Sequence, residues 1–185
     1  MQSPESITWN WDSLQNLAIE VKTLLELQQH RLVLAESCTA GMVSSVFGSL
    51  PGISESLCGS WVVYRLESKA QWLGLSRVQL HNPAFGTVCP ETTSQLAASA
   101  IMRTPEATLS CSVTGHLGPG VSEEIDGQVF ISIAKRTPEA PPSCSERRLR
   151  SPRCTSLQDF SRRRERQQEA TFLVLQELLQ SLRNQ

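Results

Sequence analysis

The segment around Ser37 holds the first residues of this sequence that could do chemistry. Residues 31–50, RLVLAESCTAGMVSSVFGSL, pass from an apolar run through a polar turn into apolar residues at helical spacing. This pattern is typical of a strand, a tight turn and a helix. Ser37 is then a candidate N-cap of that helix, whose hydroxyl accepts backbone N–H bonds, and also a candidate nucleophile, and the two roles can coexist. The segment alone leaves both readings open.

The residues that follow Ser37 are small. Thr39, Ala40 and Gly41 let a ligand approach the start of the predicted helix. Free N–H groups and the helix dipole favour anions there. We therefore expect these three residues to bind substrate.

A serine nucleophile needs a base, and Lys69 is the best candidate. A hydroxyl is a poor nucleophile until a neighbouring group takes its proton. Lysine does this when burial lowers its pKa toward neutrality. Of Lys22, Lys69 and Lys135, Lys69 alone follows a predicted strand whose aromatic residues could bury it. A solvated lysine on a helix is the alternative that spacing cannot reject.

A third polar stretch follows a predicted strand over 107–115. The loop TGHLGPG begins at Thr114 and contains three glycines, whose backbone N–H groups can cradle a phosphate or an oxyanion. Its spacing matches neither the P-loop nor the dinucleotide-binding fingerprint. An ordinary turn is the alternative.

Helical and extended patterns alternate along the chain. Helices are predicted over 13–29, 39–49, 67–75, 91–103 and 162–182, and strands over 31–35, 59–66, 107–115 and 128–136. This order predicts an α/β fold, a single three-layer α/β/α domain over residues 1–185 with a central mixed sheet. Residues 137–156 are rich in Pro, Ser and Arg and predict a flexible loop or an irregular edge segment.

The composition excludes several classes of protein. Hydrophobic residues make up 39% of the 185, and the net charge is −1, which gives no general attraction to nucleic acid. No apolar run is long enough to span a membrane, and the N-terminus lacks a signal-peptide pattern. We expect a cytoplasmic protein with reduced cysteines and, from the isolated positions of Cys and His, no structural metal site.

Four motifs together resemble one known family. AESCTAG, VVYRLESKAQWLG, FGTVC and TGHLGPG with a following SEE and GQVF are similar to the C-terminal domain of CinA, the competence/damage-inducible protein A family. Stand-alone versions of that domain are nicotinamide-nucleotide amidases. The resemblance implies hydrolysis of the carboxamide of nicotinamide mononucleotide to nicotinic acid mononucleotide and ammonia, with no metal or other cofactor.

The resemblance also implies roles for individual residues. Ser37 corresponds to the nucleophile and Lys69 to its base, with Tyr64 as a further catalytic residue at the start of the lysine motif. The substrate-binding positions that match the glycine loop and the arginine motif near the C-terminus are Thr114, Gly115, Gly118 and Arg163.

Several positions depart from the family pattern. Leu66 stands where the family has asparagine, Leu117 replaces a small alanine and is expected to narrow the pocket, and Cys89 replaces a serine. The glycine loop is about two residues shorter than the pattern. Gln167 stands where a second arginine falls, unless Arg166 substitutes for it.

These departures leave three functions open. The first is a serine–lysine amidase, and the second is a catalytically impaired ligand-binding or regulatory homologue. The third, nucleic-acid binding by the arginines of residues 147–166, is disfavoured because acidic residues interrupt that segment and only Phe160 supplies an aromatic ring. The expected partners are a small-molecule nucleotide substrate and a second copy of the chain in a homodimer, with no membrane.

Overall fold

A five-stranded mixed sheet forms the centre of the protein. The computed structural model describes residues 9–137 and 141–184. The sheet contains β1 (Leu32–Glu36), β2 (Leu57–Val62), β3 (Leu109–Gly115), β4 (Gln128–Lys135) and β5 (Ser143–Arg148) in the order β2-β1-β3-β4-β5. Strands β2, β1 and β3 are parallel, and β4 and β5 are antiparallel to their neighbours.

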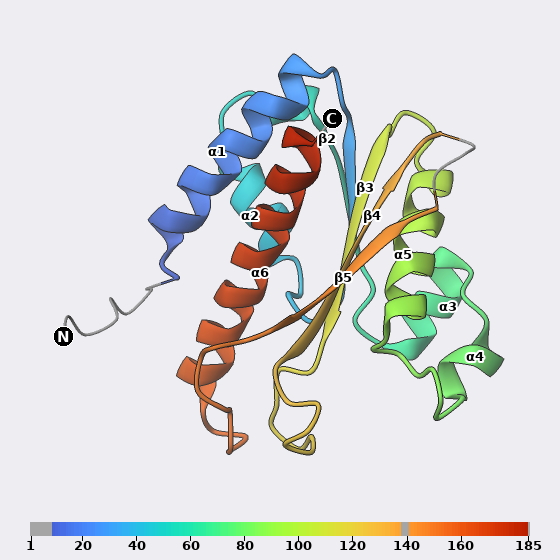
Figure 1. Cartoon of the computed structure of the whole chain (residues 1–185), viewed down its shortest axis with the longest axis vertical. Helices are drawn as coiled ribbons and strands as arrows, with labels where there is room; N and C mark the ends of the chain where they lie inside the picture. The colour runs from blue at the N-terminus through green and yellow to red at the C-terminus, as the bar shows by residue number, and fades with distance from the viewer. Residues whose placement is uncertain (1–8, 138–140, 185) are drawn as a thin grey trace.

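Helices cover both faces of this sheet. One face carries α1 (Trp11–Leu27), α2 (Met42–Gly48) and α6 (Phe160–Arg183), and the other carries α3 (Leu66–Leu73), α4 (Arg77–His81) and α5 (Pro90–Arg103) (Figure 1). A short 3-10 helix, Ile53–Glu55, precedes β2. The prediction of a three-layer α/β/α domain with a mixed sheet is confirmed.

The central strand β1 shows why the sheet needs helices on both sides. All five of its residues are buried. Leu32 and Leu34 pack into the core under α1 and α6, whereas Val33 and Ala35 pack into the core under α3 and α5. Alternate side chains of a strand point to opposite faces, so each face of β1 requires its own apolar cover.

The element boundaries differ from the predicted ones in ways that matter for the site. Strand β1 includes Glu36, and α2 begins at Met42 rather than at residue 39. Strand β2 ends at Val62, so Tyr64 lies in the connection to α3 rather than in a strand. Helix α5 begins at Pro90, one residue before the predicted start, and Cys89 is its N-cap.

Residues 137–156 contain a strand. β5 pairs with β4 at the edge of the sheet, and the prolines of the segment lie outside it. Part of the segment, residues 138–140, lies outside the described residues. Of the two predicted alternatives, an edge segment describes residues 143–148 better than a flexible loop does. The flexibility of the remaining residues stays a prediction.

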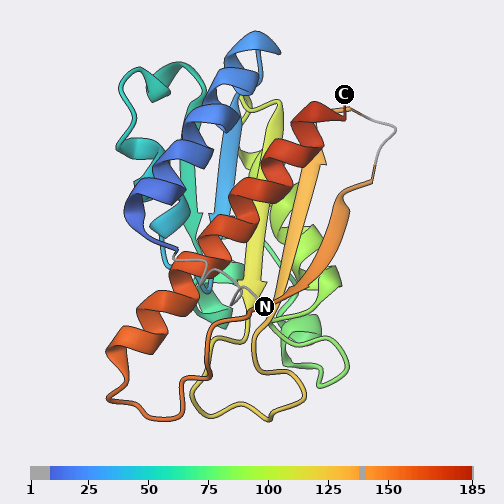
Figure 2. The ribbon, with the colours of Figure 1, turned by 60° about the vertical axis from the view of Figure 1, so that its left-hand side comes forward.

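The three parallel strands bring the polar stretches to one edge of the sheet. The turn after β1, the connection after β2 and the loop after β3 all follow the carboxyl ends of these strands, where ligands bind in open α/β sheets. The first turn of α6 lies at the same end, beside the loop between β3 and β4 (Figure 2). In the described parts of the chain, no helix has the length and apolar character needed to cross a membrane.

Candidate active site

Ser37 and Lys69 are in direct contact. The Ser37 N–H donates to the Val113 carbonyl at 3.1 Å, which continues the β1–β3 pairing and fixes the backbone of the turn. Lys69 lies in the first half of α3, and its Nζ is 2.9 Å from Ser37 Oγ, within hydrogen-bond distance. The structure thus joins two residues that are 32 positions apart in the sequence.

The surroundings of Lys69 make its neutral form easier to reach. The side chain is 1% exposed, and this burial lowers the pKa of Lys69 to about 8. Nζ also donates to the Val63 carbonyl at 2.7 Å and, more weakly, to the Tyr64 carbonyl at 3.5 Å. A neutral amine has two N–H groups for these two carbonyls and a lone pair for the Ser37 hydroxyl proton, so the site matches the needs of a general base.

The neighbouring thiol is not a competing nucleophile. Cys38 follows Ser37 directly and is 4% exposed. Burial raises the pKa of the Cys38 thiol to about 12. The thiolate is the reactive form of cysteine, so Cys38 stays protonated and inert at neutral pH.

Glu36, not Ser37, caps helix α2. One Glu36 carboxylate oxygen accepts from the Thr39 hydroxyl at 2.8 Å and from the N–H groups of Gly41 and Val43 at 3.0 Å each. The other accepts from the Ser44 N–H at 2.9 Å and the Ser60 hydroxyl at 3.0 Å. The reading of Ser37 as a cap is therefore wrong, because a buried carboxylate one residue earlier takes the donors that a serine cap would take.

The same contacts occupy groups of this turn that were predicted to bind substrate. The Thr39 hydroxyl and the Gly41 N–H both donate to Glu36, and Thr39 is 1% exposed. Ala40 and Gly41 adopt positive φ angles of 54° and 93°, which close the turn tightly. The start of α2 thus holds an internal anion, and its part in substrate binding stays a prediction.

Tyr64 and Arg163 form a second contact at the site. The Arg163 Nη2 group donates to the Tyr64 hydroxyl at 2.9 Å, and its Nη1 group donates to the Gly118 carbonyl at 2.6 Å. These residues come from the β2–α3 connection, the first turn of α6 and the loop after β3. Tyr64 is 53% exposed, so this contact faces solvent beside the buried pair.

Thr114 lies below the surface of the site, and the half-buried Gly115 lies against the turn after β1. Thr114 is fully buried, and its hydroxyl is 2.7 Å from the Thr93 hydroxyl of α5. A Cβ atom on Gly115 would lie 3.1 Å from Cys38 Sγ and 3.0 Å from the Gln128 carbonyl. Glycine at this position therefore lets the turn after β1 pack against β3.

Two departures from the family pattern have a different meaning in the structure. Leu117 is 1% exposed and belongs to the core under α1 and α6, so the expectation that it narrows the pocket is wrong. Arg166 is also buried and pairs with Asp126. Its guanidinium group therefore does not substitute for the second arginine that the family pattern places at Gln167. Gln167 instead donates from Nε2 to the Cys38 carbonyl at 3.2 Å.

Sequence reasoning missed Glu36 and Gln167 as parts of the site. The acidic residue directly before a strand-to-helix turn was a usable signal for Glu36, because carboxylates are favoured at helix N-termini. The contact of Gln167 had no local signal, since it joins residues 129 positions apart. No group of three or more metal-binding side chains occurs in the described residues.

The protein is therefore a three-layer α/β/α domain. It has a buried serine–lysine pair at the carboxyl edge of its parallel strands. Residues 14–180 match the sequence profile of the CinA C-terminal domain. The chain belongs to the CinA C-terminal domain family.

Relatives and solved structures agree with this assignment. A relative from Streptococcus pyogenes with the name competence-damage inducible protein is 38% identical over 117 residues, covering 63% of this chain and 27% of the relative. The chain thus spans about a quarter of the length of the curated relatives that it matches. The structure of the competence/damage inducible protein CihA from Agrobacterium tumefaciens is 25% identical, with a TM-score of 0.76 and full coverage of both chains.

A second structure shows how far the fold persists at low identity. The CinA superfamily protein from Klebsiella pneumoniae 700603 has a TM-score of 0.79 at 17% identity, covering 93% of this chain and 99% of its own.

Proposed function

We propose that this protein is an amidohydrolase that converts nicotinamide mononucleotide to nicotinic acid mononucleotide and ammonia, with Ser37 as nucleophile and Lys69 as base. The observation that carries the proposal is the 2.9 Å contact between Lys69 Nζ and Ser37 Oγ, together with the burial that lowers the pKa of Lys69 to about 8. Membership of the CinA C-terminal domain family supports the substrate class.

The first half of the reaction forms an acyl-enzyme. Ser37 Oγ attacks the carboxamide carbon while its proton passes to the neutral Nζ of Lys69. The N–H groups of Cys38 and Thr39, which precede the donors that Glu36 holds, would stabilise the oxyanion of the tetrahedral intermediate. The C–N bond then breaks, and the Lys69 ammonium group gives its proton to the departing nitrogen, which leaves as ammonia.

The second half reverses these roles. Water attacks the ester carbon and passes a proton to Lys69 Nζ. The bond between the ester carbon and Ser37 Oγ breaks, and Lys69 returns the proton to the serine. The acid product leaves, and the site regains its hydroxyl and its neutral amine.

Arg163 is the proposed ligand of the substrate phosphate. The donors at the start of α2 are already occupied by Glu36, so an anionic group finds no free N–H cluster there. Arg163 carries its guanidinium group to the solvent-facing side of the site, next to Tyr64. A guanidinium group has five N–H donors, so Arg163 can bind phosphate oxygens while it keeps its contacts to Gly118 and Tyr64.

An ammonia-release assay tests this function. We expect the wild-type protein to release ammonia from nicotinamide mononucleotide faster than from free nicotinamide. The Ser37→Ala substitution should lower turnover by about 1000-fold or more, because it removes the attacking atom.

Ser45→Ala is the matched control, since Ser45 is an exposed serine of α2. Its turnover should equal that of the wild type. Substantial turnover by Ser37→Ala would refute the mechanism. Binding of the nucleotide without ammonia release would instead support the impaired ligand-binding homologue.

A further inference from the structure

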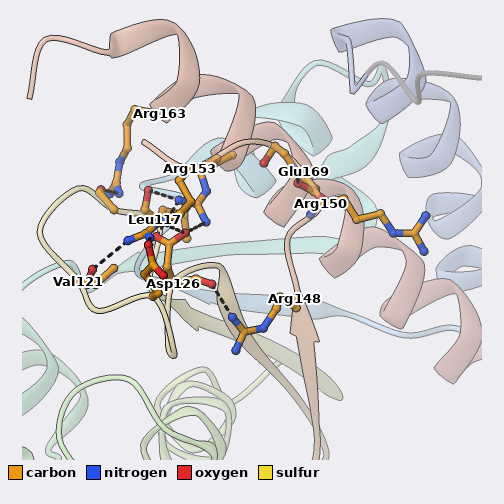
Figure 3. Close-up of polar contacts among 12 residues, drawn as sticks. Leu117, Val121, Asp126, Arg148, Arg150, Arg153, Arg163 and Glu169 are labelled. Carbon is orange, nitrogen blue, oxygen red and sulfur yellow. Dashed lines mark hydrogen bonds and ion pairs between the residues drawn. The ribbon is translucent and has the colours of Figure 1, made fainter. Parts of the chain in front are cut away.

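A buried ion pair lies behind the loop that faces the proposed site. Arg166 on α6 donates from Nη1 and Nη2 to the two carboxylate oxygens of Asp126, each at 2.9 Å. The two residues are 1% and 7% exposed. The pair joins α6 to the end of the β3–β4 loop, residues 116–127. Figure 3 shows Asp126 of this loop, with Leu117 nearby.

One guanidinium group connects both ends of this loop. Besides Asp126, Arg166 Nη1 donates to the Leu117 carbonyl at 3.3 Å, near the start of the loop. The Arg148 side chain holds the backbone of Asp126 as well, because its Nη1 group donates to the Asp126 carbonyl at 2.9 Å. Arg166 thus acts as a clamp across a loop that is short for the family pattern.

Two glycines make room for the clamp. Gly118 and Gly127 have φ angles of 62° and 79°, in the left-handed region. A Cβ atom on Gly127 would lie 2.8 Å from Arg166 Nη2, and one on Gly118 would lie 3.3 Å from Arg166 Nη1 and 2.9 Å from the Cys154 carbonyl. The loop therefore cannot take this path around Arg166 with larger residues at either position.

The clamped loop holds the arginine of the site. Arg163 lies three residues before Arg166, on the same side of α6. It donates to the Gly118 carbonyl, next to the Leu117 carbonyl that Arg166 holds, and its other end donates to the Tyr64 hydroxyl. The position of the Gly118 carbonyl thereby determines where the Arg163 guanidinium group lies.

We propose that Arg166 and Asp126 are positioning residues, which seat Arg163 against Tyr64 and so set the affinity for a phosphate-bearing substrate. This inference rests on the function proposed above. Replacing a buried ion pair with apolar residues is often neutral or stabilising, so the pair is poorly explained by stability alone. Its contact with the Leu117 carbonyl, one residue before Gly118, explains it as a device of orientation.

The single tyrosine of the chain makes the proposal testable without any activity. Tyrosine labelled with ¹³C at Cζ gives one resonance, from Tyr64, whose position reports the contact with Arg163. The reference variant Arg163→Met defines the shift that loss of this contact produces. We expect Arg166→Met and Asp126→Asn to move the resonance in the same direction.

Arg164→Met is the matched control, because Arg164 is an exposed arginine on the same turn of α6. It should leave the resonance at the wild-type position. Asp126→Asn keeps the shape of the side chain and serves if Arg166→Met does not fold. A wild-type resonance in the folded variants, or no shift in Arg163→Met, would overturn the proposal.

Kinetics distinguish positioning from a general loss of structure. With nicotinamide mononucleotide, Arg166→Met should raise KM about tenfold and leave kcat within about twofold. With nicotinamide riboside, which lacks the phosphate, kcat/KM should equal that of the wild type. Equal losses on both substrates would contradict the positioning role. If the wild type hydrolyses neither substrate, the proposed function fails, and the tyrosine resonance still decides the positioning.

Discussion

The turn after β1 and the loop after β3 lie at the same edge of the sheet but are held by opposite charges. In the turn, the Glu36 carboxylate accepts hydrogen bonds from backbone N–H groups and hydroxyls. In the loop, the Arg166 guanidinium group donates to a carboxylate and a carbonyl. In other proteins the start of a helix binds anionic ligands. Here Glu36 occupies the N–H groups at the start of α2, and the candidate ligand for an anion is Arg163 on α6.

This difference assigns separate tasks to the two regions. The turn is held by five hydrogen bonds to the Glu36 carboxylate, and it presents Ser37 to Lys69. The loop offers a carbonyl to Arg163, which remains partly exposed and close to Tyr64. We infer that chemistry resides in the turn and recognition in the loop.

The largest expected effect comes from breaking the turn. Glu36→Gln replaces one acceptor oxygen with an NH₂ group that faces backbone donors. We expect the free energy of unfolding to fall by about 2–4 kcal/mol, because several buried donors are left without an acceptor. Urea unfolding followed by circular dichroism measures this change.

Glu55→Gln is the control for Glu36→Gln, since Glu55 is exposed in the 3-10 helix before β2. Its effect should stay within about 0.5 kcal/mol. If both variants are equally stable, the carboxylate of Glu36 does not hold the turn.

A smaller effect is expected at Leu66, which begins α3 three residues before Lys69 and packs partly into the core under α5. Leu66→Asn restores the polar group of the family pattern. We expect kcat/KM on nicotinamide mononucleotide to rise about threefold, within the range that one contact to a substrate supplies. Leu66→Ala removes the same packing without adding a polar group and should not raise it. An unchanged rate in an otherwise active Leu66→Asn enzyme would show that this position does not tune the substrate.

The smallest effect is expected at the start of α5. The Cys89 thiol caps α5 by accepting from the Thr92 N–H at 3.3 Å, where α2 uses a carboxylate. Because a hydroxyl is a stronger cap, Cys89→Ser should raise the free energy of unfolding by about 0.5–1 kcal/mol. Cys58→Ser, a half-buried cysteine within β2, should not stabilise the protein. Equal effects in thermal unfolding would rule out the cap as the cause.

The sequence predicted the layers well because they depend on local periodicity. Alternating apolar patterns located β1, β3, β4 and the long helices to within a few residues. Strand β5 was anticipated only as an irregular edge segment, because SCSERR lacks β-branched residues and forms a strand through its pairing with β4. Its existence depends on a neighbour rather than on its own composition.

The site was predictable in its chemistry but not in its supports. Residue types and family resemblance predicted that Ser37 and Lys69 act as a pair, and the structure places them in contact. The sequence offered Arg166 only as a possible substitute for the family arginine at Gln167, because its partner Asp126 is 40 residues away. Leu117 read as a pocket residue, because a loop sequence does not reveal which side chains turn into the core.

The central claim is that neutral Lys69 takes the proton of Ser37, and the pH dependence of kcat/KM on nicotinamide mononucleotide tests it most directly. Burial lowers the pKa of Lys69 to about 8, and only the unprotonated amine is a base. We therefore expect kcat/KM to rise about tenfold per pH unit below that value and to level off above it. A rate that stays constant or falls as the pH increases from about 6.5 to 9 would contradict the account.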